Sequence, residues 1–354
     1  MKILIIQTAF LGDLILTTSF FREVKNKYND AEIHLIVNKG TEDILAGNKN
    51  ITRVIPFDKS KVKKSIFYFF SFIQSLRKEK FDLCLCPHFS HRSSLIAFFS
   101  GAKKRIGYKE AGFSFLHNER ISRPTRGKHE VDKLFSLLYD KDTVFPLSRK
   151  RPELFFPEER IQNIKKILES HNLKKNFIVL APSSIWETKR MPAEKFKELF
   201  FNIATNTNYS IILIGSNKDE ILCENIIERR LPEQGKKGLS DPERIFNLAG
   251  KTDLIELSYI ISQASAVVSN DSSPIHFASA HNVPTVMIYG ATVPDFGYST
   301  LSDKHFIAEV NGLPCRPCGI HGGKVCPEKH FKCMNDQNTD LIFTELLKLL
   351  ELSK

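Results

Sequence analysis

A short polar turn between two apolar segments has the residue types of an anion-binding site. The turn Asp271-Ser272-Ser273 follows an expected strand over 266–269 and precedes an expected helix over 274–281. Ser273 suits the N-cap of that helix, with Pro274 at its first position. Backbone N–H groups and the helix dipole attract anions at such a point, and a diphosphate would fit. The alternative is a plain capped helix with a buried polar turn.

A second polar loop, APSSIWETKRMPAEKF (181–196), also lies between an expected strand and an expected helix. Ser183 and Ser184 supply hydroxyl groups, and Lys189 supplies a cation that could neutralise a leaving diphosphate. The loop lacks the GxxxxGK[ST] pattern, so it is not a P-loop. The alternative is a solvated Lys-Arg pair, which suits Arg190 better than Lys189.

Four further residues are weaker candidates for contacts to a nucleotide. His276 lies one turn into the helix after the Asp-Ser-Ser turn, where it could reach a phosphate or ribose, although a lone histidine is more often structural. Gly215 and Ser216 end another expected strand, and Thr252 precedes another expected helix. Loops after parallel strands are where a nucleotide base could lie.

The chain opens with MKILIIQTAFLGDLILTTSFF, in which Asp13 interrupts a long apolar run. A secretion signal is a poor interpretation, because a carboxylate lies in the middle of the run and no small-residue cleavage site follows. A strand over 2–7 and a helix over 14–27 fit better, and they place Asp13 in the turn between them. Asp13 is then either a helix cap or a general base at the open edge of a sheet.

The C-terminal part of the chain carries four cysteines with the spacing C-x2-C-x7-C-x6-C. They are Cys315, Cys318, Cys326 and Cys333. This spacing admits a structural zinc site with four thiolates, although the second close C-x2-C pair of the common zinc motifs is missing. Free or redox-variable thiols are the alternative.

The elements that must position these residues alternate between short apolar strands and amphipathic helices, which predicts an α/β fold with parallel sheets. The chain has 354 residues, enough for two domains. A proline-rich segment over 145–157 reads as the linker. We therefore expect two Rossmann-like domains whose sheets face a central cleft, over residues 1–155 and 156–338. A C-terminal helix over 339–354 is expected to pack back on the N-terminal domain.

The charge balance of the chain favours an anionic partner. The formal net charge is +11, from 51 Lys and Arg against 40 Asp and Glu. In KSKVKKSIFYFFSFIQSLRKEK (59–80), lysines flank a very apolar helix, as in segments that lie on anionic membranes, and a core helix is the alternative. Nucleic acid is disfavoured, because the aromatic residues lie in apolar helices and are not interleaved with the charges. No secretion signal is recognised, so a cytoplasmic protein is expected.

Together these motifs resemble one family, the ADP-heptose:lipopolysaccharide heptosyltransferases, which are inverting glycosyltransferases of the GT-B architecture. The similarity is greatest to the heptosyltransferases that add the second heptose of the inner core. The matching residues run in order along the chain: Thr8 with Leu11-Gly12-Asp13, Lys103 to Tyr108, Pro182-Ser183-Ser184 with Lys189, Ala249 to Thr252, Asn270 to Pro274 with His276, and Tyr289 to Thr292. Ser273 stands where many members have glycine.

The resemblance implies that Asp13 is the general base and that Lys189 binds the phosphates of an ADP-heptose donor. It places Ser184, Asp271, Ser272, Ser273 and His276 at donor-binding positions of the second domain, and it implies a lipopolysaccharide core lipid as acceptor at the first domain. From the residues themselves we expect further donor contacts from Ser183, Gly215, Ser216 and Thr252. We expect acceptor contacts from Thr8, Gly12, Arg92 and Arg105. No metal or other cofactor would be required, and the enzyme would work at the inner face of the inner membrane.

Two other interpretations of the sequence remain. The chain could be a related GT-B transferase that uses another nucleotide sugar or another glycan acceptor. It could instead be a non-catalytic metal-binding or redox protein built around the cysteines. A Rossmann oxidoreductase is disfavoured, because no GxGxxG follows any expected strand.

Overall fold

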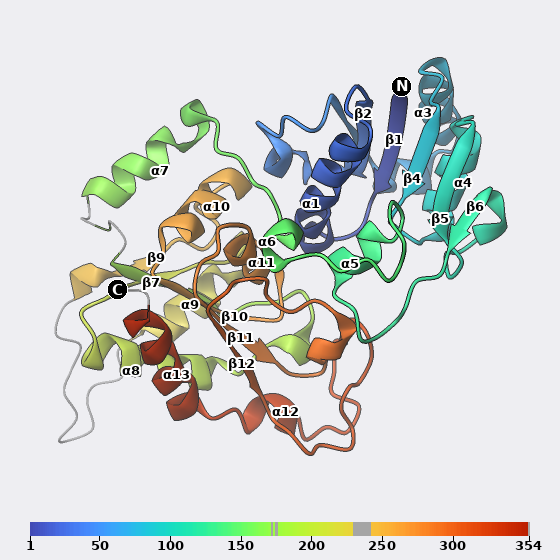
Figure 1. Cartoon of the computed structure of the whole chain (residues 1–354). Helices are drawn as coiled ribbons and strands as arrows, with labels where there is room; N and C mark the ends of the chain where they lie inside the picture. The colour runs from blue at the N-terminus through green and yellow to red at the C-terminus, as the bar shows by residue number, and fades with distance from the viewer. Residues whose placement is uncertain (171–172, 174–175, 229–241, 353–354) are drawn as a thin grey trace. The chain divides into compact units, whose positions relative to one another are not determined.

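The computed structural model describes residues 1–170, 173, 176–228 and 242–352. The chain divides into two compact units, Met1–Phe155 and Phe156–Lys354. In the described residues each unit contains one six-stranded sheet flanked by helices (Figure 1). The predicted α/β class with two Rossmann-like parallel sheets is confirmed.

The sheet of the first unit has the strand order β3-β2-β1-β4-β5-β6, and every pairing is parallel. Its strands are β1 (Lys2–Gln7), β2 (Glu32–Asn38), β3 (Arg53–Phe57), β4 (Leu83–Cys86), β5 (Lys104–Tyr108) and β6 (Glu119–Ile121). Its helices are α1 (Leu11–Lys27), α2 (Lys59–Lys64), α3 (Ile66–Lys78), α4 (His91–Phe99), α5 (Glu130–Phe135) and α6 (Leu147–Lys150).

The sheet of the second unit has the order β12-β11-β10-β7-β8-β9, again with every pairing parallel. Its strands are β7 (Phe177–Ala181), β8 (Ser210–Leu213), β9 (Ile245–Asn247), β10 (Ala266–Asn270), β11 (Thr285–Tyr289) and β12 (His305–Glu309). Its helices are α7 (Glu158–Ser170), α8 (Ala193–Asn206), α9 (Glu220–Ile227), α10 (Leu254–Gln263), α11 (Ser273–Ala280), α12 (Lys332–Asn335) and α13 (Thr339–Glu351).

The central strands of the second unit are buried along their whole length because helices cover both faces of the sheet. Every residue of β7, β10 and β11 is buried, as expected for parallel strands packed on both sides. In the first unit α3 and α4 pack on one face of the sheet. In the second unit α8, α9 and α13 share the core on one face, while Ile275 of α11 packs against Met287 and Tyr289 in a separate cluster.

The strand order locates the ligand-binding edge of each sheet. When the strands are numbered along their own unit, each sheet has the doubly wound order 3-2-1-4-5-6. Strands 2 and 3 lie on one side of strand 1, and strands 4, 5 and 6 lie on the other side. Ligands of such sheets bind at the carboxyl ends of the strands, where the order reverses. This point lies between β1 and β4 in the first unit and between β7 and β10 in the second.

The C-terminal helix α13 corrects one prediction from the sequence. It was expected to pack back on the N-terminal domain, but it packs on α8, β11 and β12 of the second unit. Ile342, Leu346 and Leu350 supply its apolar face to the core there. The amphipathic pattern predicted the buried face correctly, but it carried no information about which sheet that face would meet.

None of the described helices is long and apolar enough to cross a membrane.

The packing of α13 predicts a large difference between two leucines of this helix. Leu346 is fully buried in the second unit's core, whereas Leu341 is 46% exposed. Leu346→Ala should lower the free energy of unfolding by about 3 kcal/mol, because it leaves a cavity, and Leu341→Ala by less than about 1 kcal/mol. Urea unfolding followed by circular dichroism measures both. Equal effects of the two substitutions would contradict the packing of α13.

Candidate active site

A buried ion pair joins the two polar loops that the sequence singled out. Lys189 ends the 3₁₀ turn η3 (Glu187–Lys189) after β7, and Asp271 follows β10 directly. The Lys189 Nζ atom lies 2.6 Å from Asp271 Oδ2, and the two side chains are 13% and 6% exposed. Thr292, after β11, donates its hydroxyl to the same carboxylate oxygen at 2.6 Å. Three loops at the carboxyl edge of the sheet therefore converge on one carboxylate, which holds the Lys189 ammonium in place.

Asn270 fixes the Lys189 loop to the end of β10. Its side-chain Oδ1 accepts a hydrogen bond from the Met191 amide at 3.1 Å, and its Nδ2 donates to the Pro182 carbonyl at 2.8 Å. Asn270 is fully buried, so these bonds satisfy polar groups that water does not reach. They tie both ends of the loop 182–191 to one residue. Ser183 and Ser184 lie inside this loop, and Ser184 is buried.

The N-terminus of α11 lies beside the ion pair, with one correction to the expected cap. Ser272, not Ser273, is the N-cap residue, and Ser273 and Pro274 begin the helix. The Asp271 amide donates to the Ile288 carbonyl at 3.0 Å, so it does not point outward as expected. Of the first three residues of α11, Pro274 has no N–H group and the Ile275 amide donates to the Ser272 carbonyl at 3.2 Å, so the Ser273 amide is the one that can serve an anion. His276, the fourth residue of α11, is 4% exposed.

The weaker candidates Gly215, Ser216 and Thr252 lie in two neighbouring loops of the second unit. The Gly250 amide donates to the Gly215 carbonyl at 3.0 Å, which joins the loops after β8 and β9. The amide and hydroxyl of Ser216 both donate to Asp219 Oδ2, at 2.8 and 2.6 Å. Thr252 is half-buried. These contacts give Ser216 a capping role, and they leave a ligand role for the three residues as a prediction.

The cysteine-bearing tail supports the Lys189 loop from its other side, which the sequence did not reveal. The Gly323 amide donates to Thr188 Oγ1 at 2.7 Å, and the Thr188 amide donates to the Gly323 carbonyl at 3.1 Å. Gly322 has a φ of +80°, and a Cβ at this position would lie 2.9 Å from Thr188 Oγ1. The close contact between tail and loop therefore requires a glycine at position 322.

Arg316 connects the same tail to Thr292. Its guanidinium donates to the carbonyls of Gly290 at 2.7 Å and Thr292 at 2.8 Å, and it pairs with Glu309 at 2.6 Å. The Arg316 side chain is only 7% exposed. It holds the backbone of Thr292, whose hydroxyl binds Asp271. Arg316 and Thr188 thus position the ion pair without touching it.

The four tail cysteines lie near one another as free thiols. Burial raises the pKa of Cys333 to about 11, and the charges of Cys318, Cys326 and Cys315 add to the rise. Cys315 Sγ lies 3.8 Å from His330 Nε2. Within the described ranges, no three His, Cys, Asp or Glu side chains form a group that could hold a metal ion. Zinc binding by these cysteines stays a prediction, and the tail contacts described above hold the Lys189 loop.

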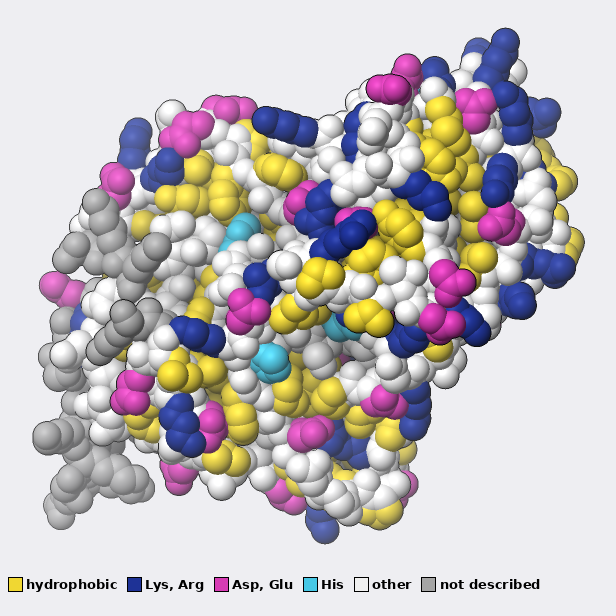
Figure 2. All heavy atoms as spheres, in the orientation of Figure 1, with side chains coloured by type: hydrophobic (Ala, Val, Ile, Leu, Met, Phe, Trp, Pro, Cys, Tyr) yellow, Lys and Arg dark blue, Asp and Glu magenta, His cyan; other side chains and the backbone are white. Residues whose placement is uncertain are grey.

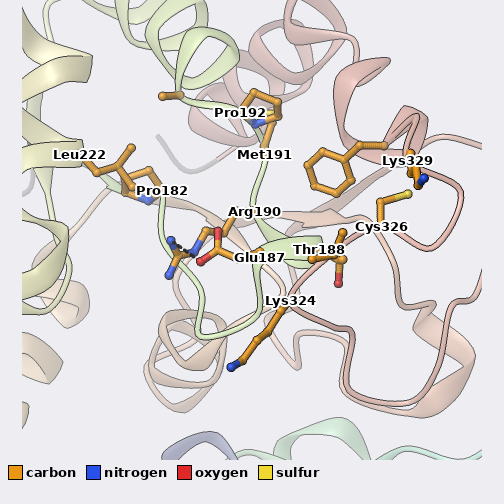
Figure 3. Close-up of a pocket in the computed structure, with 13 residues that line it drawn as sticks. Pro182, Glu187, Thr188, Arg190, Met191, Pro192, Leu222, Lys324, Cys326 and Lys329 are labelled. Carbon is orange, nitrogen blue, oxygen red and sulfur yellow. Dashed lines mark ion pairs between the residues drawn. The ribbon is translucent and has the colours of Figure 1, made fainter.

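A pocket of about 550 Å³ lies between the Lys189 loop and the tail (Figure 3). Its walls include Thr188, Met191, Leu222 and Cys326. An ion pair of 3.1 Å between Glu187 and Arg190 lies at its side. Lys189 and Asp271 do not line it, so it is separate from the candidate donor site.

Asp13 occupies the third position of α1, directly after the loop that follows β1. Its carboxylate accepts a hydrogen bond of 3.3 Å from the Phe10 amide, so it does cap the helix. The side chain is half-buried rather than enclosed. Gly12 precedes it in the first turn of α1. The structure thus places Asp13 at the edge where the strand order of the first unit reverses, and the capping bond occupies one of its oxygens.

A network at this same edge contains residues that the sequence reasoning missed. Thr8 Oγ1 lies 2.8 Å from His88 Nδ1, and Ser93 Oγ lies 2.9 Å from the same nitrogen. Lys59 Nζ donates to the Thr8 carbonyl at 2.6 Å. The polar segment HFSHRSS (88–94) directly follows β4, just as the Asp13 loop follows β1. This position after a strand was the sequence signal that could have identified these residues.

The charges in this network are of one sign. Burial, together with the nearby charges of Lys59 and Arg92, lowers the pKa of His88 to about 4. Burial also lowers the pKa of Lys59, with added repulsion from Arg92 and Lys63. Two cations and a neutral histidine therefore lie at the edge that carries Asp13, an arrangement that would favour an anionic group of a ligand.

Arg105 does not belong to this site, contrary to expectation. It is the second residue of β5 and pairs with Cys84 near the amino end of β4, away from the carboxyl edge. Its guanidinium donates to the carbonyls of Leu116 at 3.0 Å and Ala102 at 2.8 Å. Arg105 therefore holds a turn in place, and the structure removes it from the acceptor candidates.

Comparisons with known proteins extend over most of the chain. The sequence model of glycosyltransferase family 9 (heptosyltransferase) matches residues 69–330. Lipooligosaccharide heptosyltransferase 2 of Haemophilus influenzae is 28% identical over 88% of this chain and 89% of its own length. Lipopolysaccharide heptosyltransferase 2 of Salmonella typhimurium is 27% identical over 84% of each chain.

Solved structures agree with this fold. The structure of the Escherichia coli ADP-heptose lipopolysaccharide heptosyltransferase II superposes with a TM-score of 0.76, at 24% identity and 99% coverage of both chains. A family 9 glycosyltransferase from Veillonella parvula superposes with a TM-score of 0.80, at 19% identity, over 99% of this chain and 97% of that one.

The half-buried His88 predicts a loss of stability in mild acid. Its pKa of about 4 lies below the usual 6.5, so the folded chain holds fewer protons than the unfolded chain between these values. Stability should therefore fall as the pH drops from about 6.5 to 4. His88→Gln should flatten this fall, with His117 and His281 causing the remainder.

Urea unfolding of the wild type and His88→Gln at several pH values tests this. The difference between the two proteins at pH 8 reports the lost packing alone and serves as the control. An unchanged slope in the variant would contradict the burial of a neutral His88.

Proposed function

The chain belongs to glycosyltransferase family 9 (heptosyltransferase), and we propose that it moves a heptose from ADP-heptose to the inner core of lipopolysaccharide with inversion. The observation that carries the proposal is the Lys189–Asp271–Thr292 cluster beside the N-terminus of α11. It provides a fixed cation and the Ser273 amide at the point where doubly wound sheets bind nucleotides. The relatives, whose names describe heptosyltransferases, supply the identity of the sugar.

The donor diphosphate would lie between Lys189 and the first turn of α11. As the bond from the anomeric carbon to the diphosphate oxygen breaks, negative charge grows on the ADP leaving group. A fixed ammonium and fixed backbone dipoles stabilise that charge without rearranging, which is the larger part of such catalysis. Asp271 lowers the positive charge of the site but keeps the ammonium in one position. Groups of the chain itself would thus stabilise the negative charge of the leaving ADP, so we propose that transfer needs no metal.

Asp13 would act as the general base. The acceptor hydroxyl gives its proton to the Asp13 carboxylate while its oxygen bonds to the anomeric carbon, on the face opposite the departing ADP. One step of this kind inverts the anomeric centre. The half-buried position of Asp13 at the carboxyl edge supports this role, because a base must reach its substrate. The family match begins at residue 69, so the role of Asp13 rests on its place in the fold.

The acceptor would bind the first unit around Thr8, Gly12 and Arg92, with Lys59 added by the structure. These residues surround the network at the carboxyl edge, where cations outnumber acids. A lipopolysaccharide core carries phosphate and carboxylate groups that such cations would hold. A lipid-linked acceptor also implies work at an anionic membrane, and we propose the cytoplasmic face of the inner membrane. The tail cysteines as a zinc site stay a prediction.

The test is release of ADP on mixing the protein with ADP-heptose and a heptose-deficient core lipid. Acceptor-dependent release supports the proposal. Tight ADP binding without release would point to another sugar or acceptor for the same fold. Absence of both binding and release would overturn the transferase assignment.

Asp13→Asn should reduce turnover by about 10²- to 10⁴-fold, because the amide cannot take the proton. ADP affinity should stay unchanged, since the donor residues lie on the second unit. The substituted side chain keeps a carbonyl oxygen that can accept from the Phe10 amide, so the helix cap survives.

Asp132→Asn is the matched control for that substitution. Asp132 also occupies the third position of a helix, α5, in the same unit, and it pairs with Lys150 at 2.8 Å. Turnover of this variant should match the wild type. Equal losses in both variants would mean that Asp13 acts only on helix stability.

Lys189→Gln should weaken ADP binding by about 10- to 100-fold, because a charge-assisted contact to phosphate is lost. Isothermal titration calorimetry measures this, with Lys195→Gln on α8 as the control that should bind normally. Turnover of the wild type should be unchanged by EDTA. Unchanged ADP affinity in Lys189→Gln would remove Lys189 from the donor site.

A further inference from the structure

A group of large apolar side chains is exposed on the first unit. We call Ile66, Phe67, Phe70, Phe98, Phe99 and Phe115 the aromatic face. Phe67 is 82% exposed, Phe115 71% and Phe70 61%. Such residues normally lie inside, and a contiguous exposed set marks a surface that binds something. Figure 2 shows hydrophobic side chains among Lys and Arg side chains in the region where Figure 1 places α3 and α4.

Ring contacts connect the parts of the aromatic face on α3 and α4. Phe69, a buried residue of α3, has ring contacts with Phe70 at 6.3 Å and with Phe99 at 6.5 Å. Phe98 and Phe99 at the end of α4 are 5.3 Å apart. The Arg105 guanidinium lies over Phe98 at 5.5 Å and bonds the Leu116 carbonyl next to Phe115.

Helix α3 has two apolar sides, one buried and one exposed. Phe69, Phe72, Ile73 and Leu76 face the sheet and are buried. Ile66 and Phe70, four residues apart, share an outward side of its first turns. Ile66 and Phe70 lie outside the core of the first unit, so packing within the protein does not explain why these positions are apolar.

Lysines without acidic partners flank the aromatic face. The short helix α2 ends at Lys64, two residues before Ile66, and carries Lys61, Lys63 and Lys64. In the described part of the chain none of these three forms an ion pair, and Lys61 lies over the Tyr68 ring at 5.7 Å. Exposed aromatic residues beside unpaired lysines match the interface of an anionic bilayer, which takes rings at the headgroup level and attracts cations.

A second copy of the chain fits this surface less well. An interface between two copies of one patch would place the α2 lysines of both copies in or beside one interface. Their like charges would repel, and the residues that make up the aromatic face are all apolar, so they offer no acidic groups to balance them. The positive charge of the α2 lysines therefore favours an anionic partner.

We propose that the aromatic face and the α2 lysines dock the enzyme on a bilayer that contains anionic lipid. The inference deepens the proposed function and rests on it, because a lipid-linked acceptor gives the docking its purpose. Phe67 and Phe70 would enter the headgroup region while Lys63 and Lys64 contact lipid phosphates. The docking itself requires neither ADP-heptose nor the acceptor.

The experiment is co-sedimentation of the full-length protein with vesicles, without either substrate. Wild type should bind vesicles of about 70% phosphatidylcholine and 30% phosphatidylglycerol, and bind pure phosphatidylcholine at least about tenfold more weakly. Phe67→Ser/Phe70→Ser should lose at least about tenfold in affinity for the anionic vesicles. Lys63→Gln/Lys64→Gln should lose about fivefold for each charge removed, and binding of wild type should weaken in high salt.

The matched control is Lys166→Gln/Ile167→Ser on α7 of the second unit, where Ile167 is 41% exposed. This variant should bind the anionic vesicles like the wild type. Thermal unfolding verifies that each variant is folded. Wild-type binding by the Phe67/Phe70 variant, or equal loss in the control, would overturn the proposal and leave the face to a protein partner. Vesicle binding without sugar transfer would refute only the proposed function.

Discussion

One ion pair organises the second unit. The bond between Lys189 and Asp271 crosses the point where the strand order reverses, so it joins two loops that are more than 80 residues apart in the chain. Buried charges of this kind are stable only when they are paired and hydrogen-bonded. Thr292 supplies the extra hydrogen bond, and Asn270 and Thr188 hold the loop on either side. These contacts support that pair in the second unit of this GT-B glycosyltransferase.

The first unit uses charge differently. Its edge collects Lys59 and Arg92 around a neutral His88, and their mutual repulsion contributes to the lowered pKa values of His88 and Lys59. Repulsion of this kind persists in a folded protein when the rest of the fold outweighs it, and an anion relieves it. The second unit thus holds a balanced charge ready for a leaving group, while the first holds an unbalanced one. This asymmetry suits a reaction that brings an anionic acceptor to an anionic donor.

The sequence was most informative about features that depend on the local pattern of residues alone. Short apolar strands predicted parallel sheets, and the polar turns after them drew attention to Lys189 and Asp271, which the structure pairs; the family and fold predictions are confirmed. Arg105 was misplaced because the sequence did not reveal that it lies inside strand β5, near the amino end of that strand. His88 was missed because its partners, Thr8 and Ser93, lie on other elements. Contacts that depend on strand order cannot be read from local pattern.

The tail illustrates the same limit and adds a consequence for biosynthesis. The spacing of its cysteines suggested a metal site. The contacts that the structure shows are hydrogen bonds from Gly323 to Thr188 and from Arg316 to Thr292. These supports lie more than a hundred residues beyond Lys189 along the chain. During translation the Lys189 loop therefore emerges long before the segments that hold it. The nascent chain can form its first sheet and most of its second, but the Lys189 loop gains these contacts only after Gly323 has left the ribosome.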